Sequence, residues 1–131
     1  FLEVIASCVS MANQCDYSLT HHFANARRLI NDEDRAEKIW NALRTEKWSD
    51  AFEGKELALI QYAHKLTLSV GKMVQSDIEH LHQAGCDDGE ILEVNQVCAY
   101  FNYSNRLLNG LGVTTQGDVI GYYKDKPAEG L

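Results

Sequence analysis

Residues 88–110 read DGEILEVNQVCAYFNYSNRLLNG. Apolar side chains recur there at the spacing of one helix face, namely Ile91, Val94, Cys98, Phe101 and Leu108. Val97, Ala99 and Tyr100 widen this face, so we expect the central, buried helix of the protein here. An aspartate caps the expected start of the helix, and a glycine ends it.

Five more helices are expected before this segment. They span Phe1 to about Gln14, about 16–30, about 34–43, Lys55 to about Val70, and Ser76 to Gly85. Asn13 or Asp16 is expected to cap the second helix, and Ser76 with Glu79 forms a capping-box pattern for the fifth. Trp48 and Phe52 are expected to anchor a polar connector. The tail, residues 113–131, is expected to wrap a surface or another subunit.

Composition supports the same fold class. The chain has 131 residues, 45% of them apolar and 24% charged, which is typical of one globular domain spanning 1–131. The single proline is Pro127, and the first glycine is Gly54. Because turn signals are missing from the first half, β-sandwiches and barrels are excluded. We predict an all-α bundle of about six helices.

Charge and cysteine content limit the partners and the compartment. The net charge of −7 disfavours nucleic acid and anionic membranes as partners. No apolar run approaches the roughly 20 residues that span a bilayer. Four cysteines without a disulfide framework predict reduced thiols and a cytoplasmic location. Because the chain begins at Phe1, we expect that an N-terminal segment precedes it.

One group of side chains stands apart from the core pattern. It comprises Glu3, Cys15, Ser18, His21 and His22. Ser18 and His22 are four residues apart, so they share a helix face, and Cys15 lies at the start of that helix. The positive end of a helix dipole favours a thiolate, an imidazole can relay a proton, and a carboxylate can orient the imidazole. This set predicts a nucleophile, a base and an orienting group.

These residues resemble the active-site motif of the alkylhydroperoxidase D-like proteins of the carboxymuconolactone decarboxylase superfamily. The motif is a glutamate, then Cys-x-x-Cys, then a histidine four residues after the second cysteine. Strings along the rest of the chain resemble the peroxidase-related branch: Tyr62-Ala63-His64-Lys65-Leu66-Thr67, Asp77…Leu81…Ala84-Gly85, Asp88…Ile91, and Tyr100-Phe101-Asn102…Asn105-Arg106…Gly110-Leu111-Gly112-Val113.

The resemblance implies an all-helical homo-oligomer, a dimer or a trimer of dimers, which reduces organic hydroperoxides without a metal or other cofactor. In such proteins the second cysteine attacks the peroxide and the first resolves the sulfenic acid as a disulfide. Ser18 stands at the attacking position in this chain, and a serine cannot form a sulfenic acid. Either Cys15 works as a single redox thiol with an external thiol reductant, or Cys8 resolves it.

Three functions remain open on these residues. The first is a peroxidase in which Cys15 is the redox thiol, His22 relays protons, Glu3 orients His22 and Ser18 hydrogen-bonds to the reacting centre. The second is a binding or structural oligomer without peroxidase activity. The third is cofactor-free acid/base chemistry by His22 and Glu3 on a small lactone or keto acid.

The sequence gives less support to a hydrolase or a metal site, and it assigns the remaining histidines, cysteines and Arg106 to other positions. A Ser-His-Glu hydrolase would need a strand-turn-helix elbow to expose its serine, and the chain has none. A metal site is disfavoured because adjacent histidines point about 100° apart on a helix. His21 is expected to be exposed or at an interface, and His64 to lie on a solvated face. Cys8, Cys86 and Cys98 are expected in the core, and Arg106 at a subunit contact.

Overall fold

The computed structural model describes residues 1–121, and all regular structure in that range is helical. The elements are α1 (Leu2–Ala12), α2 (Asp16–Ile30), α3 (Glu33–Thr45), η1 (Trp48–Asp50), α4 (Gly54–Leu68), η2 (Val70–Lys72), α5 (Gln75–Gln83) and α6 (Asp88–Gly110). Here η marks a single 3-10 turn. The prediction of an all-α bundle of about six helices is confirmed.

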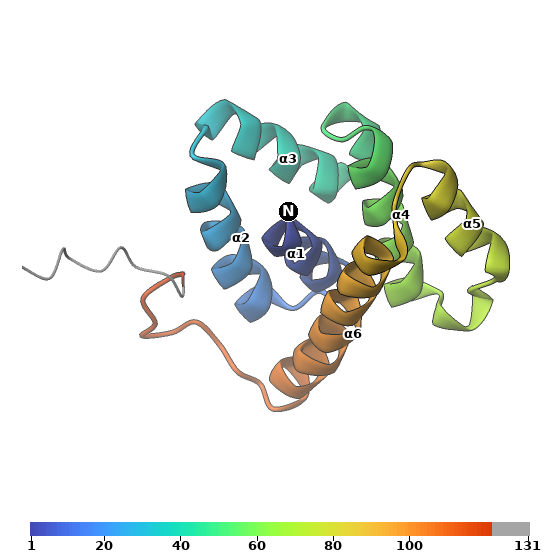
Figure 1. Cartoon of the computed structure of the whole chain (residues 1–131). Helices are drawn as coiled ribbons and strands as arrows, with labels where there is room; N and C mark the ends of the chain where they lie inside the picture. Colours follow the sequence, from blue (N-terminus) through green and yellow to red (C-terminus); the bar gives the residue numbers. More distant parts are fainter. Residues whose placement is uncertain (122–131) are drawn as a thin grey trace, which may run out of the picture.

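The centre of the bundle is α1. Figure 1 shows it in the middle, with α2, α3, α4 and α6 around it, and α1 packs against each of these four helices. Every residue from Val4 to Ser10 is buried. This burial follows from the sequence, because α1 has few polar side chains on any of its faces.

The expectation that residues 88–110 form the central helix is wrong. Helix α6 is buried along one strip, at Ile91, Val94, Cys98 and Asn105. Tyr100, expected in the core, is 60% exposed, and Ala99 is exposed as well. Because α1 already occupies the centre, α6 covers one side of it and turns its opposite face outward (Figure 1).

Aspartate side chains cap the N-termini of α3 and α6. The Asp32 carboxylate accepts the backbone N–H of Arg35 at the start of α3. At α6, the Asp87 carboxylate accepts the N–H of Glu90 at 2.8 Å, and the Glu90 carboxylate accepts the N–H of Asp87 at 2.9 Å. The predicted aspartate cap of α6 is therefore confirmed, and it is reciprocal.

The capping prediction for α5 is wrong. This helix begins at Gln75, and Val74 rather than Ser76 holds the N-cap position. Asp77 accepts the Val74 N–H at 2.9 Å and pairs with Lys65 at 2.7 Å. The Lys65 ammonium, followed by the Val74 N–H, holds the pKa of Asp77 below its usual range. Asp77, at the third helical position, thus supplies the side-chain bond to the backbone at the start of α5. Gly85 ends α5 with φ +93°, as expected.

The connector and the tail behave as the sequence suggests over the described residues. Phe52 is buried, and Trp48 is half-buried against the core. Residues 113–121 run from the end of α6 back to α2, which Figure 1 shows as a loop beside that helix. The expectation for residues 122–131 lies outside the described part of the chain. Across residues 1–121, no helix has the length and apolar character needed to cross a membrane.

Candidate functional site

A tight turn between α1 and α2 positions Cys15. Gln14 adopts φ +53°, and the Cys15 backbone N–H donates to the Ser10 carbonyl at 2.8 Å. Cys15 itself is the N-cap residue of α2, and neither Asn13 nor Asp16 caps the helix by its side chain, contrary to expectation. The backbone bond to Ser10 fixes the turn in place of a side-chain cap.

Glu3 and His22 meet across the α1–α2 pair, as the sequence predicted. His22 Nδ1 lies 2.7 Å from Glu3 Oε2, and both side chains are more than four-fifths buried. A carboxylate only accepts, so Nδ1 carries the proton of this bond. Phe101 of α6 packs edge-on against the His22 ring, with 4.5 Å between ring centroids. The result is an imidazole whose orientation is fixed by Glu3 on one side and by Phe101 on another.

Ser18 shares the helix face of Cys15 and His22, but its hydrogen bond goes to α1. Ser10 Oγ lies 2.8 Å from Ser18 Oγ and 3.3 Å from Asn105 Oδ1, and all three side chains are buried. Within residues 1–121, Asn105 Nδ2 has no hydrogen-bond partner. A buried polar network therefore joins α1, α2 and α6 beside the Cys15 turn, and it holds Ser18 in place.

The Cys15 thiol is fully buried, at 0% exposure. Among the described residues its sulfur makes no hydrogen bond, so none joins it to His22. A proton passing between the two groups would therefore travel through a bound substrate or one water molecule. The structure places Cys15, Ser18, His22 and Glu3 in one region, but it joins only the last two directly.

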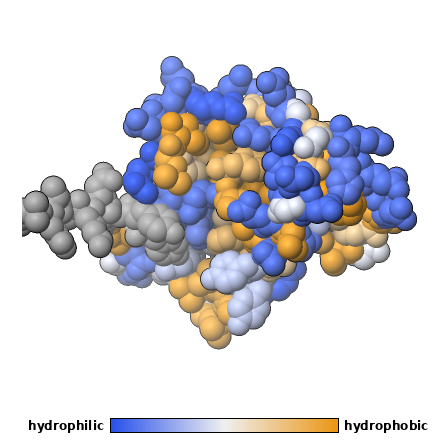
Figure 2. Space-filling view, in the orientation of Figure 1, coloured by the Kyte–Doolittle hydropathy of each residue, from blue (hydrophilic) through white to orange (hydrophobic). Residues whose placement is uncertain are grey.

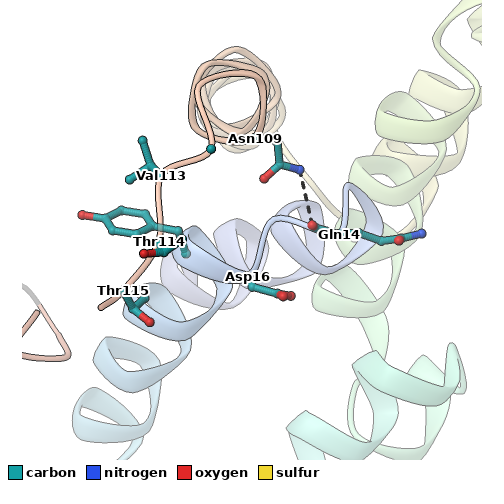
Figure 3. Close-up of a pocket in the computed structure, with 8 residues that line it drawn as sticks. Gln14, Asp16, Asn109, Val113, Thr114 and Thr115 are labelled. Carbon is teal, nitrogen blue, oxygen red and sulfur yellow. Dashed lines mark hydrogen bonds between the residues drawn. The ribbon is translucent and has the colours of Figure 1, made fainter. Parts of the chain in front are cut away.

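A pocket of about 380 Å³ opens at the Cys15 turn. Its walls include the residues on either side of the cysteine, Gln14 and Asp16, together with Asn109 at the end of α6 and Thr114 and Thr115 of the tail (Figure 3). Asn109 Nδ2 donates to the Gln14 carbonyl at 3.3 Å, the bond drawn in Figure 3. The pocket thus lies beside the Cys15 turn and is bounded by the start of α2, the end of α6 and the tail.

His21 is buried, at 2% exposure, and the expectation that it is exposed is wrong. Its Nε2 lies 3.1 Å from Asp118 Oδ2, and its Nδ1 accepts the Gly121 N–H at 3.1 Å. The tail covers this histidine, and a tail of weak sequence pattern gives no signal for that contact. His21 and His22 therefore hold different partners, one on the tail and one on α1.

The other cysteines lie in the core, as expected. Cys86 and Cys98 are buried, and burial is the largest cause that raises the pKa of each thiol. Cys8 lines a different cavity, of about 170 Å³, with Leu43 of α3 and His64 of α4. His64 is half-buried against Trp48, so its predicted solvated position is wrong.

Sequence reasoning missed two residues of the site. Ser10 bridges α1 to Ser18, and Asn105 continues that network into α6. Two features of the sequence could have indicated this network. One is a serine within an apolar helix, and the other is an asparagine on the apolar strip of α6. Over residues 1–121, no three His, Cys, Asp or Glu side chains are grouped to hold a metal ion.

Comparisons with known proteins bear on the fold of the chain. No family model matches the chain, and no curated protein matches it. The solved structures that are similar to this chain include two peroxidase-related proteins. One is an uncharacterized peroxidase-related protein from Silicibacter sp. TM1040, with a TM-score of 0.76 and 26% identity. The other is the alkylhydroperoxidase AhpD core, an uncharacterized peroxidase-related protein from Ralstonia eutropha JMP134, with a TM-score of 0.74 and 24% identity.

Each similarity covers 86% of this chain and 57% of the matched one. The chain thus spans less than two-thirds of the length of both proteins. Over that length the helices superpose, with no strand in residues 1–121. The chain therefore has the alkylhydroperoxidase D-like fold of the peroxidase-related proteins, which its motifs implied.

Proposed function

We propose that this chain is a thiol-dependent, peroxidase-like oxidoreductase in which Cys15 is the redox thiol. The observation that carries the proposal is the Glu3–His22 bond of 2.7 Å on the helix that Cys15 begins. This pair orients an imidazole on the helix whose N-terminus carries the Cys15 thiol. Peroxide reduction needs both groups, because a thiolate must attack and the leaving oxygen must receive a proton.

The proposed cycle has three steps: oxidation of Cys15, formation of a mixed disulfide and release of Cys15. The Cys15 thiolate attacks the outer oxygen of a hydroperoxide, the O–O bond breaks, and Cys15 becomes a sulfenic acid. The alkoxide that leaves takes a proton relayed by His22, whose positive charge Glu3 stabilises. An external thiol then condenses with the sulfenic acid, releasing water, and a second thiol releases Cys15 from the mixed disulfide. Two thiols are oxidised for each hydroperoxide reduced.

The volume of the pocket beside the Cys15 turn suggests the substrate class. Cys15 is fully buried, and the adjoining pocket of about 380 Å³ lies near the lower limit of small-molecule sites. We therefore propose a small hydroperoxide as substrate and an external thiol as reductant, with no metal or other cofactor. Four free cysteines fit a reducing compartment, so we propose a cytoplasmic location.

Trapping the sulfenic acid tests this proposal. The protein is mixed with one equivalent of hydrogen peroxide in the presence of dimedone, and the labelled cysteine is located by mass spectrometry. We expect the adduct on Cys15, with no adduct at this position in Cys15→Ser. Cys98→Ser, which removes a buried core thiol, is the matched control and should leave the labelling of Cys15 unchanged. Absence of an adduct on Cys15 in the folded protein contradicts the proposal.

A second candidate is acid/base chemistry without a thiol. It is favoured by one observation, namely that the Cys15 sulfur is buried and unbonded in the described structure while Glu3 and His22 are already joined. Such a site would move a proton on a small lactone or keto acid. Turnover of a lactone that survives in Cys15→Ser and is lost in His22→Gln would support this alternative over the peroxidase.

We also propose that the chain forms homo-oligomers, as a dimer or a trimer of dimers. Helix α6 and the residues after it leave large apolar side chains exposed, including Tyr100, Tyr103, Leu107 and Leu111. Figure 2 shows hydrophobic surface at the lower end of the molecule, where α6 ends in Figure 1. A second copy would remove this surface from water. Leu107→Glu should shift sedimentation toward the monomer.

A further inference from the structure

A groove separate from the Cys15 pocket lies between α4 and α6. It has a volume of about 300 Å³, and its lining is mostly apolar. The apolar walls are Leu66, Val70 and Ala99, and polar groups come from Thr67, Asn102 and Arg106. This volume is at the lower end of the range of small-ligand sites, about 300–1,000 Å³.

Arg106 brings a positive charge to this groove. Its Nη1 donates to the backbone carbonyl and to the side-chain oxygen of Asn102, each at 3.0 Å. Among residues 1–121, no carboxylate pairs with Arg106, and its other N–H groups donate to no described residue. A guanidinium presents its N–H groups in a planar fork that matches a carboxylate.

Asn102 fixes the position of the guanidinium. Its Nδ2 donates to Thr67 Oγ1 at 3.1 Å and to the Cys98 carbonyl at 2.9 Å, and its Oδ1 accepts from Asn13 Nδ2 at 3.0 Å. Because α1, α4 and α6 all hold this amide, Arg106 is oriented before any ligand arrives. Such preorganisation lowers the entropy cost of binding.

We propose that this groove binds a small aliphatic monocarboxylate. The carboxylate accepts hydrogen bonds from the Arg106 guanidinium, and the hydrocarbon chain lies against Leu66, Val70 and Ala99. Since the whole chain carries a net charge of −7, long-range attraction of an anion is absent, and the local cation supplies the recognition. The site is independent of the proposed redox thiol.

A titration with octanoate, followed by amide chemical shifts in the ¹⁵N spectrum, tests the proposal. We expect saturable shifts confined to residues 66–70 and 95–106. Octanol, which keeps the chain but lacks the charge, should bind at least tenfold more weakly. Arg106→Gln should weaken octanoate binding by about tenfold or more, as expected for loss of a charge-assisted pair. Lys38→Gln removes the same charge from the exposed face of α3 and should leave the binding unchanged.

Several results would overturn the proposal. Equal affinity for octanoate and octanol would show that the guanidinium does not recognise the carboxylate. Unchanged binding in Arg106→Gln, or shifts that map elsewhere, would also refute it. If a second copy covers the groove, sedimentation will show the oligomer and octanoate will fail to bind, which again rejects the proposal. Ala99→Leu, an exposed helix position, should fill the groove and lower the affinity without unfolding the protein.

Discussion

Two clusters in this molecule contain the same kinds of side chain, yet they differ in geometry. The site cluster comprises Glu3, Cys15 and His22, and the second cluster comprises Cys8, Glu46 and His64. Each has a buried thiol, an imidazole and a carboxylate. Counting residue types would rank the two clusters equally.

The carboxylate–imidazole contact separates them. In the site cluster, Glu3 and His22 form a hydrogen bond of 2.7 Å between largely buried side chains. In the second cluster, Glu46 Oε1 lies 3.3 Å from His64 Nε2 without hydrogen-bond geometry, and the Glu46 side chain is largely exposed. A solvated carboxylate that forms no bond fixes neither the tautomer nor the orientation of its imidazole.

The thiols differ in position as well. Cys8 lies in the middle of the central helix, and burial, followed by the charges of Cys98 and Glu46, raises the pKa of its thiol to about 12. Cys15 stands at the N-cap of α2, where the helix dipole favours a negative charge. Backbone position, more than residue type, therefore distinguishes a candidate redox thiol from a core thiol.

The largest expected effect comes from Ser18→Cys in the site cluster. It restores two cysteines three residues apart at a helix N-terminus, so the new thiol can attack peroxide and Cys15 can close a disulfide. We expect hydroperoxide consumption with excess dithiol to rise on the order of 100-fold, since the thiol that resolves the sulfenic acid then lies in the same chain and need not arrive from solution. Peroxide loss is followed by a ferrous-ion dye assay.

A matched variant in the same network makes this test specific. Ser10→Cys places an added thiol within the same buried network but off the α2 face. It should leave the rate near that of the parent. A gain of equal size in both variants would mean that any added thiol suffices, and the site geometry would then have no special role.

The two carboxylates provide the next contrast. Glu3→Gln keeps the shape of the side chain but removes the charge that stabilises protonated His22, so the rate of Cys15 oxidation should fall roughly tenfold or more. Glu46→Gln in the second cluster should change it less than about twofold, because exposed pairs contribute little. Both rates come from quenched-flow trapping with dimedone. Equal losses would show that the charge of Glu46 affects the oxidation of Cys15 as much as the charge of Glu3 does.

The site cluster was accessible from the sequence because its spacing is local. Cys15, Ser18 and His22 lie within eight residues, and helical geometry alone puts them on one face. Glu3, the partner of His22, lies on the preceding helix, so helical spacing alone could not pair the two. The second cluster joins residues from α1, α4 and the end of α3, and no periodicity could bring those together.

The errors concern burial more than secondary structure. The apolar face of residues 88–110 predicted a central helix, but a helix with a wide apolar stripe can also keep part of that stripe exposed. Tyr100 shows this, since it is exposed in the described chain. His21 was misjudged because its cover is Asp118, nearly a hundred residues away in a segment without periodic pattern.

The raised pKa of the Cys8 thiol in the second cluster predicts a loss of folding stability at high pH. The Cys8 thiol has its pKa raised from 9.0 to about 12 in the fold. Below pH 9 the thiol is neutral in both states, so this group then costs nothing. As the pH rises through 9 toward 12, the unfolded chain releases the proton while the folded chain retains it, and stability is lost. At pH 10 the loss from this group is about 1.4 kcal/mol.

Urea unfolding at pH 8 and pH 10 measures that loss. We expect the decrease in unfolding free energy between the two pH values to be about 1.4 kcal/mol smaller in Cys8→Ala than in the parent. Contributions from other groups cancel in this double difference. The same decrease in both proteins would show that Cys8 titrates normally, and the second cluster could then supply a thiolate as readily as the site cluster.

The smallest effect concerns the tail that covers the α2 side. Asp118 Oδ2 accepts from His21 Nε2, because Nδ1 is already the acceptor of the Gly121 N–H. Asp118→Ala leaves the His21 donor without this partner and should cost about 1 kcal/mol of unfolding free energy. Asp50→Ala, in the exposed connector, is the control and should cost less than half as much.

The same variant separates two roles of the tail. Thr114 and Thr115 of the tail also line the pocket at the Cys15 turn, so a loosened tail changes access to the buried thiol. If the tail limits entry, Asp118→Ala should speed the alkylation of Cys15 by iodoacetamide severalfold while Cys8 stays unreactive. If the tail only supports α2, stability falls and the alkylation rate of Cys15 does not change. The Cys8 thiol serves as the internal reference, because global unfolding would expose both cysteines together.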